Sequence, residues 1–207
     1  MRPLPRVHAI TDAAVLSAPD FGVRAAAIAA AGPAVALHAR DRGGAVVRLA
    51  AAASRMMALA RPPEAAVFVN GWPDLAAALG ALGVQLGAGD LAPADARRLL
   101  PRGWIGRSVH SAEEAGMAVE EGADFLMVGS IYETSSHPGW PAAGPELVRV
   151  AAGFGRPVIA IGGVTPERAL ELRAAGAYGV AAIRALWQAA DPAAATLAML
   201  APWAETT

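Results

Sequence analysis

The sequence contains no cysteine and no lysine. The lack of cysteine excludes disulfides and thiolate chemistry. The lack of lysine excludes a lysine Schiff base, so any phosphate held by side-chain charge must be held mainly by arginine. The net charge is only −1, which provides no overall field to attract nucleic acid or an anionic membrane. We therefore expect neither of these as a partner.

Long apolar runs are also missing from this chain of 207 residues. The N-terminal segment MRPLPRVHAITD contains two prolines and is not typical of a signal peptide. The alanine-rich stretches are interrupted by Arg, Asp, Gly or Pro, so none offers the roughly 20 apolar residues of a membrane-spanning helix. Hydrophobic residues still make up 55% of the chain, enough for a substantial core. We expect a cytoplasmic protein with a single domain over residues 1–207.

Short apolar runs alternate with alanine- and leucine-rich runs along the chain. Several short runs, such as PVIAIGG at 157–163, are almost continuously apolar, which is typical of parallel strands buried on both faces. The predicted strands are Val7–Thr11, Ala34–Arg40, Ala65–Asn70, Val84–Leu86, Trp104–Val109, Phe125–Ser130, Pro157–Gly163 and Tyr178–Arg184. The predicted helices are Asp20–Ala31, Ala45–Ala60, Pro73–Leu82, Pro93–Leu100, Ala112–Glu121, Pro145–Gly153, Pro166–Ala175 and a final run from about Pro192.

These strand–helix units predict a single-domain α/β fold, a (β/α)8 TIM barrel, because they recur regularly at roughly 20–30 residues each. A doubly wound open sheet is the alternative. It is disfavoured because no G-x-G-x-x-G motif follows the first predicted strand. In a barrel, ligands bind at the carboxyl ends of the strands. The residues at these ends are therefore the candidates for a functional site.

Two neighbouring strand ends carry the strongest phosphate signal. Gly162 and Gly163 end the seventh predicted strand, and Ile183 and Arg184 end the eighth. Glycines let backbone N–H groups approach an anion closely, and barrels often bind phosphate with the loops after strands seven and eight. A tight turn that requires glycine is the alternative explanation for the pair. We predict phosphate binding by all four residues.

The other strand ends carry polar residues that predict substrate contacts. The hydroxyl-rich segment ETSSHPG at 133–139 is alternatively a solvated surface loop, and Asp90 is alternatively a cap of the helix near Pro93. Asn70 is followed by Gly71 rather than by an acid, so the paired carboxylates of a magnesium site are missing here and we expect no metal. The predicted contacts are Arg40, Asn70, Asp90, Ser108, Thr134 and Ser136.

His110 lies in the stretch IGRSVHSAEEA, just before a predicted helix. Ser111 and Glu114 form an S-x-x-E capping box, which accounts for the helix start without His110. An imidazole suits proton transfer near pH 7. His110 is therefore the candidate catalytic residue, and His38, at the end of the second strand, is a second candidate. His8 lies near the start of the first strand, far from the expected mouth.

Several short motifs, taken together, resemble one known family. They are similar to motifs of the thiamine phosphate synthase superfamily, which contains the synthases and the thiazole tautomerases of the TenI type. The resemblance implies a (β/α)8 barrel. Within the superfamily, RSVHS at 107–111 and the pair Glu133-Thr134 resemble the tautomerase branch. The motifs are, in order, HAITD, VFVN, LGAGDL, IGRSVHS, GADFLMVGSIYET, VIAIGGV and GAYGVAAI.

The chain departs from the pattern of the synthase branch. Synthases join a hydroxymethylpyrimidine pyrophosphate to a thiazole phosphate, and they carry Q-x-R-x-K at strand two, Asn-Asp at strand three and T-x-T-K after strand six. Here the Gln and Arg of the first segment are lost and Arg40 replaces its Lys. Gly71 replaces a magnesium-binding Asp, and His137 replaces the last Lys. A pyrophosphate leaving group needs metal and cations to neutralise its charge.

The resemblance to the tautomerases implies that His110 moves a proton while a carboxythiazole phosphate tautomer is isomerised to its aromatic form, with no cofactor. Arg40 or His38 would contact the substrate carboxylate. One alternative is a thiamine phosphate synthase, which would require Mg²⁺. A second alternative is a non-catalytic regulator that binds thiamine or thiazole phosphates. We expect a small-molecule thiazole phosphate as the partner, and a homo-oligomer.

Overall fold

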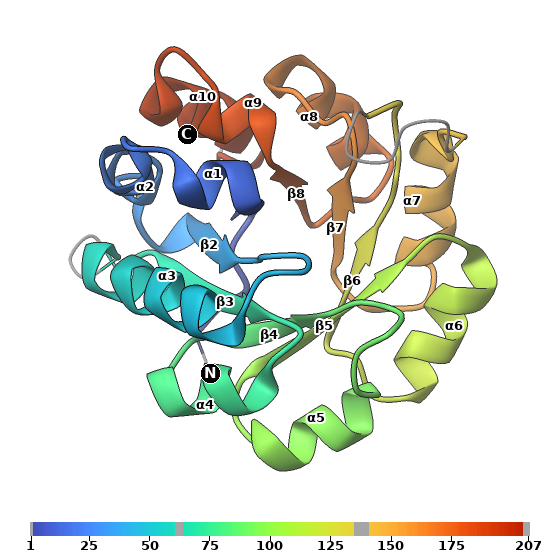
Figure 1. The fold of residues 1–207 in the computed structure, drawn as a ribbon. Helices are drawn as coiled ribbons and strands as arrows, with labels where there is room; N and C mark the ends of the chain where they lie inside the picture. The colour runs from blue at the N-terminus through green and yellow to red at the C-terminus, as the bar shows by residue number, and fades with distance from the viewer. Residues whose placement is uncertain (1, 61–63, 135–140, 205–207) are drawn as a thin grey trace.

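Eight parallel strands close into a barrel in the order β1 to β8, with helices around the outside (Figure 1). The computed structural model describes residues 2–60, 64–134 and 141–204. The ring closes because β1 pairs with β8, with Val7 opposite Val180. The prediction of a (β/α)8 barrel is confirmed, and the open-sheet alternative is wrong. The strands are β1 (Val7–Ile10), β2 (Val35–Ala39), β3 (Ala66–Asn70), β4 (Gly83–Leu86), β5 (Trp104–Val109), β6 (Phe125–Val128), β7 (Val158–Ile161) and β8 (Gly179–Ala182).

Each predicted helix is found, and two short helices are added. The added ones are α1, which Asp12 starts by accepting a hydrogen bond from the Val15 amide at 2.9 Å, and α9. The helices of the described residues are α1 (Ala13–Ser17), α2 (Phe21–Ala29), α3 (Val46–Leu59), α4 (Pro73–Leu79), α5 (Pro93–Leu99), α6 (Ala112–Glu120), α7 (Gly144–Ala152), α8 (Pro166–Ala174), α9 (Arg184–Trp187) and α10 (Pro192–Leu200), with 3₁₀ turns η1 (Gly32–Ala34) and η2 (Ala201–Trp203).

Five strands end earlier than predicted, β1 and β2 by one residue and β6, β7 and β8 by two. β6 ends at Val128 rather than at Ser130, and β7 ends at Ile161 rather than at Gly163. Gly162 and Gly163 have φ angles of 97° and 62°, in the left-handed region that an extended strand does not use. The glycine pair therefore belongs to a loop at the barrel mouth, not to the strand.

Side chains alternate between two cores, even in strands that are apolar throughout. In β3, Val67 and Val69 pack between the sheet and the helices, whereas Ala66 and Phe68 point into the barrel. This alternation follows from the period of two in an extended strand. It places Asn70, two positions after Phe68, on the inner side at the carboxyl end of β3.

Two glycines inside the barrel make room for aromatic rings. Phe68 and Phe125 are fully buried, and their ring centroids lie 5.8 Å apart in an edge-to-face arrangement. A Cβ atom at Gly106 would overlap Phe125 and the Gln85 side chain, and one at Gly83 would overlap Phe68. The interior is thus filled by side chains, and a ligand must bind above it at the mouth.

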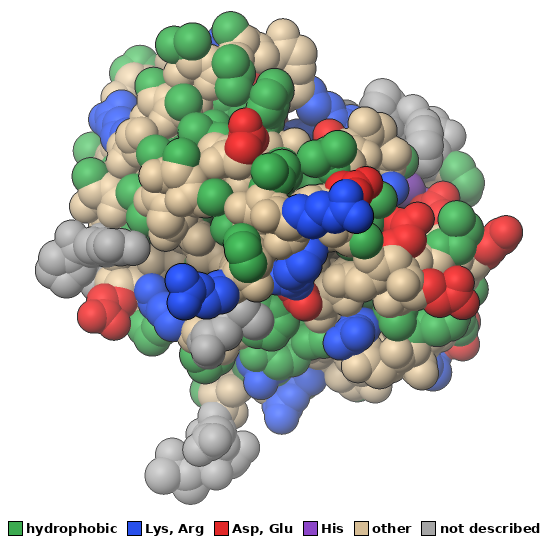
Figure 2. Space-filling model, turned by 90° about the horizontal axis from the view of Figure 1, so that it is seen from below, with side chains coloured by type: hydrophobic (Ala, Val, Ile, Leu, Met, Phe, Trp, Pro, Cys, Tyr) green, Lys and Arg blue, Asp and Glu red, His purple; other side chains and the backbone are tan. Residues whose placement is uncertain are grey.

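The face shown in Figure 2 mixes both signs of charge. Arginines and carboxylates are interspersed among apolar and uncharged side chains there, in keeping with the small net charge. Within residues 2–60, 64–134 and 141–204, no helix has the length and apolar character needed to cross a bilayer.

Candidate active site

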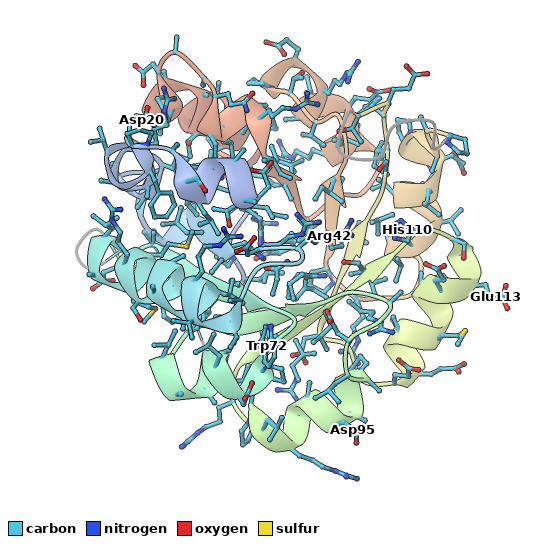
Figure 3. The ribbon with its side chains drawn as sticks, in the orientation of Figure 1. Asp20, Arg42, Trp72, Asp95, His110 and Glu113 are labelled. Atoms are coloured by element: carbon cyan, nitrogen blue, oxygen red, sulfur yellow. The ribbon has the colours of Figure 1, made fainter. Side chains whose placement is uncertain are left out.

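Thr11 ties the carboxyl ends of β1 and β2 together. Its Oγ1 lies 2.9 Å from the His38 carbonyl oxygen and 3.0 Å from that of Arg40, and it accepts a hydrogen bond from the Arg40 amide at 2.9 Å. Arg40 is half-buried at this end of the barrel. The loop that follows carries Arg42, which lies over the middle of the ring of strands in Figure 3.

The charge environment of Arg40 favours an anionic ligand. Burial lowers the pKa of Arg40, the positive charge of Arg42 lowers it further, and Asp12 raises it. A bound carboxylate or phosphate would offset the repulsion between the two guanidinium groups. The predicted contact of Arg40 with a substrate carboxylate therefore stays a prediction with a physical basis.

Asp90 does not cap a helix. Its Oδ2 accepts a hydrogen bond from the Gly87 amide at 2.7 Å, which closes the β4–α5 loop, while the N-cap residue of α5 is Ala92. Asp90 faces Gly71, because a Cβ atom at Gly71 would lie 3.2 Å from Asp90 Oδ1. The capping alternative is wrong, and Asp90 lies at the mouth opposite the end of β3.

Asp90 provides a single carboxylate at this part of the mouth, the lower end of what a magnesium site uses. A magnesium site between phosphates normally uses one or two carboxylates held in a fixed arrangement. Here a glycine lies where a second carboxylate would face Asp90, and one Asp90 oxygen is already engaged by the Gly87 amide. Among the described residues, no group of three or more His, Asp or Glu side chains gathers at a common point.

His110 is held in one orientation at the carboxyl end of β5. Its backbone amide donates to Glu114 Oε2 at 2.6 Å, and its ring atom Nδ1 bonds the Gly129 carbonyl oxygen. Ser111 Oγ accepts from the Glu114 amide at 3.1 Å, as the predicted capping box requires. Glu114 reaches back one residue further than expected, to His110 instead of Ser111, so the helix start itself positions His110.

This orientation fixes the tautomer of His110. A carbonyl oxygen only accepts hydrogen bonds, so Nδ1 carries the hydrogen that it shares with Gly129. In the neutral ring the lone pair is then on Nε2, which is the basic nitrogen. His110 is exposed, and Figure 3 shows it beside the start of α6, at the rim of the barrel. An oriented, accessible imidazole meets the geometric requirement for a general base.

Ser108 lies two residues before His110, on the inner side of β5. The Gln85 side chain donates from Nε2 to Ser108 Oγ at 3.0 Å and to the Leu86 carbonyl at 3.3 Å. Gln85 Oε1 is buried and has no partner among the described residues. Ser108 is half-buried and keeps its own hydroxyl hydrogen to donate, which is consistent with the predicted substrate contact.

Close packing explains the glycine pair after β7. A Cβ atom at Gly162 would lie 2.7 Å from Ser130 Cα, and one at Gly163 would lie 2.7 Å from the Glu133 carbonyl oxygen. The tight-turn alternative is therefore supported. Within the described part of the chain, however, the amide hydrogens of Gly163 and Val164 have no backbone acceptor, so the same turn leaves two donors for an anion.

The second predicted phosphate loop is adjacent to the first. β7 and β8 pair in register with Ile161 opposite Ala181, so the residues that follow them, Gly163 and Ile183, leave the sheet side by side. Arg184 is exposed at the start of α9. The structure brings the four predicted phosphate residues to one edge of the mouth.

An interaction that the sequence did not reveal joins the β6–α7 loop to α8. The Tyr132 hydroxyl donates to Glu171 Oε2 at 2.6 Å, and the Arg168 guanidinium lies 4.2 Å from the Tyr132 ring centroid. Arg168 also donates to the Gly163 carbonyl at 2.5 Å. Burial, followed by the hydrogen bond to Glu171, raises the pKa of Tyr132 to about 12. Thr134 is half-buried beyond this contact, and Ser136 lies outside the described residues.

The sequence also gave no sign of a buried histidine pair. His8 Nδ1 lies 2.7 Å from His38 Nε2, and both rings are fully buried inside the barrel. His38 Nδ1 in turn lies 3.1 Å from the Asn70 amide. Burial lowers the pKa of His8 to about 4 and that of His38 well below its ordinary value. His38 is thus covered at the mouth, which leaves Arg40 as the candidate for a carboxylate contact.

Comparison with known proteins assigns the chain to a family. The family model described as thiamine monophosphate synthase matches residues 7–186. The chain belongs to this family. It is 47% identical over 147 residues to a thiamine-phosphate synthase from Thermus thermophilus, covering 70% of this chain and 71% of the relative. It is 42% identical over 204 residues to one from Salinispora tropica, covering 97% of this chain and 98% of the relative.

Solved structures agree with this assignment. A thiamine phosphate pyrophosphorylase from Pyrococcus furiosus superposes with a TM-score of 0.81 at 31% identity, covering 95% of this chain and 94% of that one. The family that the motifs resemble is therefore confirmed. These relatives are named as synthases. Their names agree with the synthase alternative of the sequence analysis and not with the tautomerase branch.

Proposed function

We propose that this member of the thiamine monophosphate synthase family binds a carboxythiazole phosphate at the barrel mouth and isomerises its non-aromatic tautomer to the aromatic form. The observation that carries the proposal is the position of His110. Glu114 and the Gly129 carbonyl hold its backbone and its ring, so that Nε2 is the basic nitrogen at an accessible rim.

The isomerisation needs one group that takes up and returns a proton. A ring C–H beside a carboxylate and an imine is acidic, so Nε2 of His110 removes this hydrogen as a proton while the C–H electron pair moves into the conjugated system. The imidazolium then returns the proton at the other end of that system. No atom is gained or lost, and aromatisation supplies the driving force. The Gly129 carbonyl stabilises the imidazolium through Nδ1.

The anionic groups of the substrate fit the remaining contacts. The amide hydrogens of Gly163 and Val164, with the neighbouring Ile183–Arg184 turn, are suited to a phosphate. Arg40 suits the carboxylate, since an anion would offset its repulsion by Arg42. Thr134, Ser136, Ser108 and Asn70 are then left to orient the ring.

A second candidate is the coupling of a pyrimidine pyrophosphate to a thiazole phosphate. The names of the relatives favour this activity over the isomerisation, because relatives at 42–47% identity are named thiamine-phosphate synthase. The single carboxylate at Asp90 and the lack of lysine argue against it, because a pyrophosphate leaving group needs charge neutralisation.

Two assays on the intact protein separate these activities. One follows conversion of the carboxythiazole phosphate tautomer without added metal. The other follows thiamine phosphate formation from the two phosphorylated heterocycles with Mg²⁺. We expect turnover in the first assay only. Robust coupling with no isomerisation would support the synthase instead, and tight binding of thiamine phosphate without any turnover would indicate a regulator.

A further inference from the structure

A line of polar groups runs through the interior of the barrel to its mouth. It begins at the Pro5 carbonyl oxygen, which lies 3.0 Å from His8 Nε2. It continues from His8 Nδ1 to His38 Nε2 at 2.7 Å, and from His38 Nδ1 to the Asn70 amide at 3.1 Å, with Oδ1 as the nearer amide atom. The only member that reaches the mouth is Asn70, which is half-buried.

The first group in this line fixes the direction of every hydrogen bond when both rings are neutral. The Pro5 carbonyl can only accept, so His8 donates from Nε2 and its Nδ1 must accept. His38 then donates from Nε2, which leaves its Nδ1 as an acceptor. Asn70 must therefore donate, so its two amide atoms exchange places relative to the 3.1 Å contact above. Nδ2 then faces His38, and Oδ1 turns toward the mouth.

The opposite amide orientation requires an extra proton on the pair. If Asn70 Oδ1 faces His38 Nδ1, that nitrogen must carry a hydrogen, and His38 becomes a cation. The surroundings oppose this charge. Burial is the largest cause of the lowered pKa of both rings, and His8 lowers the pKa of His38 further. At neutral pH the neutral arrangement is favoured.

The neighbours of the pair supply no compensating charge. The ring of Phe68, from β3, stacks on His38 with centroids 4.9 Å apart, and Phe125, from β6, lies 5.9 Å from His8. Besides burial, the Pro5 carbonyl acts on the pKa of His8, and His8 and the neutral Asn70 amide act on the pKa of His38. No carboxylate or guanidinium is among these causes.

We propose that His8 and His38 are positioning residues that hold the Asn70 amide with Oδ1 turned to the mouth. The β3 end of the mouth is then a hydrogen-bond acceptor. An acceptor repels phosphate and carboxylate oxygens, which favours their binding at Arg40 and at the glycine loop after β7. The pair thereby determines which way round a phosphorylated ligand lies. This consequence rests on the proposed function only in assuming that the mouth binds such a ligand.

The tautomers can be read directly by ¹⁵N NMR of the histidine rings. In the wild-type protein at pH 7 we expect both His8 and His38 to be neutral with the hydrogen on Nε2. A cationic His38, or a His38 with its hydrogen on Nδ1, would overturn the proposal. This measurement needs no substrate and no turnover, so its outcome is independent of which reaction the protein catalyses.

Two nearly isosteric variants test the link between the pair and Asn70. His8→Asn keeps an acceptor near the position of Nδ1, whereas His8→Leu removes it. His38 should keep its hydrogen on Nε2 in His8→Asn and move it to Nδ1 in His8→Leu, which reverses the Asn70 amide. The same tautomer in both variants would contradict the proposal. A merely structural role for His8 would change stability but not the tautomer of His38.

Binding of inorganic pyrophosphate gives the functional readout. In His8→Leu the reversed Asn70 offers an N–H donor, and we expect pyrophosphate to bind about tenfold more tightly than to the wild type or His8→Asn. Equal affinities in all three proteins would refute the effect on anions. If His8→Leu does not fold, Asn70→Asp takes its place, because a carboxylate facing His38 should make His38 a cation at pH 7; a neutral ring there would also overturn the proposal.

Discussion

The two halves of the barrel interior are built differently. From β1 to β5 the inner side carries His8, His38, Asn70, Gln85 and Ser108, and these polar groups bond one another. From β6 to β8 the inner side is apolar, with Phe125, Met127, Ile159 and Ala181 among its residues. Buried polar groups are costly unless they are hydrogen-bonded, and in the first half they pair in two groups, His8–His38–Asn70 and Gln85–Ser108. The second half is fixed by packing alone.

The same division extends to the mouth. Above the polar half the available groups are side chains, namely Arg40, Asn70, Asp90 and Ser108. Above the apolar half, within the described residues, the backbone amides of Gly163 and Val164 lack a backbone acceptor, and the exposed Arg184 follows β8. Backbone amides do not titrate, which suits a phosphate that must be held in the same way throughout a reaction. His110, the proposed proton shuttle, lies between these two regions, at the end of β5.

The largest effect on stability is expected where the two halves meet. Gly106→Ala places a methyl group into Phe125 and the Gln85 side chain, and overpacking of a filled core costs about 3 kcal/mol. Urea unfolding measures the loss in free energy of unfolding. Gly89→Ala is the matched control, because a Cβ atom there meets nothing within 4 Å. Equal losses in the two variants would mean that the interior is not tightly filled.

Acid should lower the free energy of unfolding through the histidines of the polar half. The pKa of His8 is about 4 in the folded protein against an ordinary value of 6.5, so the unfolded chain binds more protons between these values. The free energy of unfolding should therefore fall as the pH drops from 6.5 to 4, by up to about 1.4 kcal/mol per pH unit for this residue, and the slope due to His8 should fade as the pH rises past 6.5.

Comparison with His8→Asn isolates this contribution. The variant lacks the titrating ring, so its unfolding free energy should depend less steeply on pH in the same window, measured by urea unfolding at several pH values. Identical slopes in the two proteins would show that the His8 ring is not held neutral by burial.

The smallest effect concerns the contact that fixes the glycine loop. Tyr132→Phe removes the hydrogen bond to Glu171 and should cost about 1 kcal/mol. It should also weaken binding of inorganic phosphate a few-fold, measured by calorimetry, because the loop around Gly163 is less well fixed. Tyr178→Phe removes a hydrogen bond to the Leu4 carbonyl, near the start of the chain. It should lower stability similarly but leave phosphate binding unchanged.

Much of this arrangement is predictable from the sequence, and the reasons are local. Continuously apolar strands at regular spacing predicted the barrel, and the S-x-x-E motif predicted that Ser111 starts α6 and leaves His110 available. Each of these inferences depends on residues close together in the chain. The end of β7 was predicted too late, at Gly163 instead of Ile161, because the apolar pattern continues through Gly162 and Gly163. The positive φ angles of these glycines cannot be recognised from that pattern.

The inner network was not predictable in the same way. Whether His8 points into the barrel depends on the register of β1, and a shift by one residue would turn it to the outside. Its partner His38 is 30 residues away in the chain. Likewise, the contact between Tyr132 and Glu171 joins two separate βα units, and Asp90 bonds its own loop where a helix cap was an equally reasonable interpretation.

The most direct test of the central claim is proton exchange at the substrate. The carboxythiazole phosphate tautomer is incubated with the protein in D₂O, and loss of the ring C–H signal is followed by NMR. The wild type should exchange and isomerise it, whereas His110→Ala should do so about 10²- to 10⁴-fold more slowly while binding it with similar affinity. Glu113→Gln, at a neighbouring position in α6, should behave as the wild type. Unchanged exchange in His110→Ala would contradict the assignment of His110 as the proton shuttle.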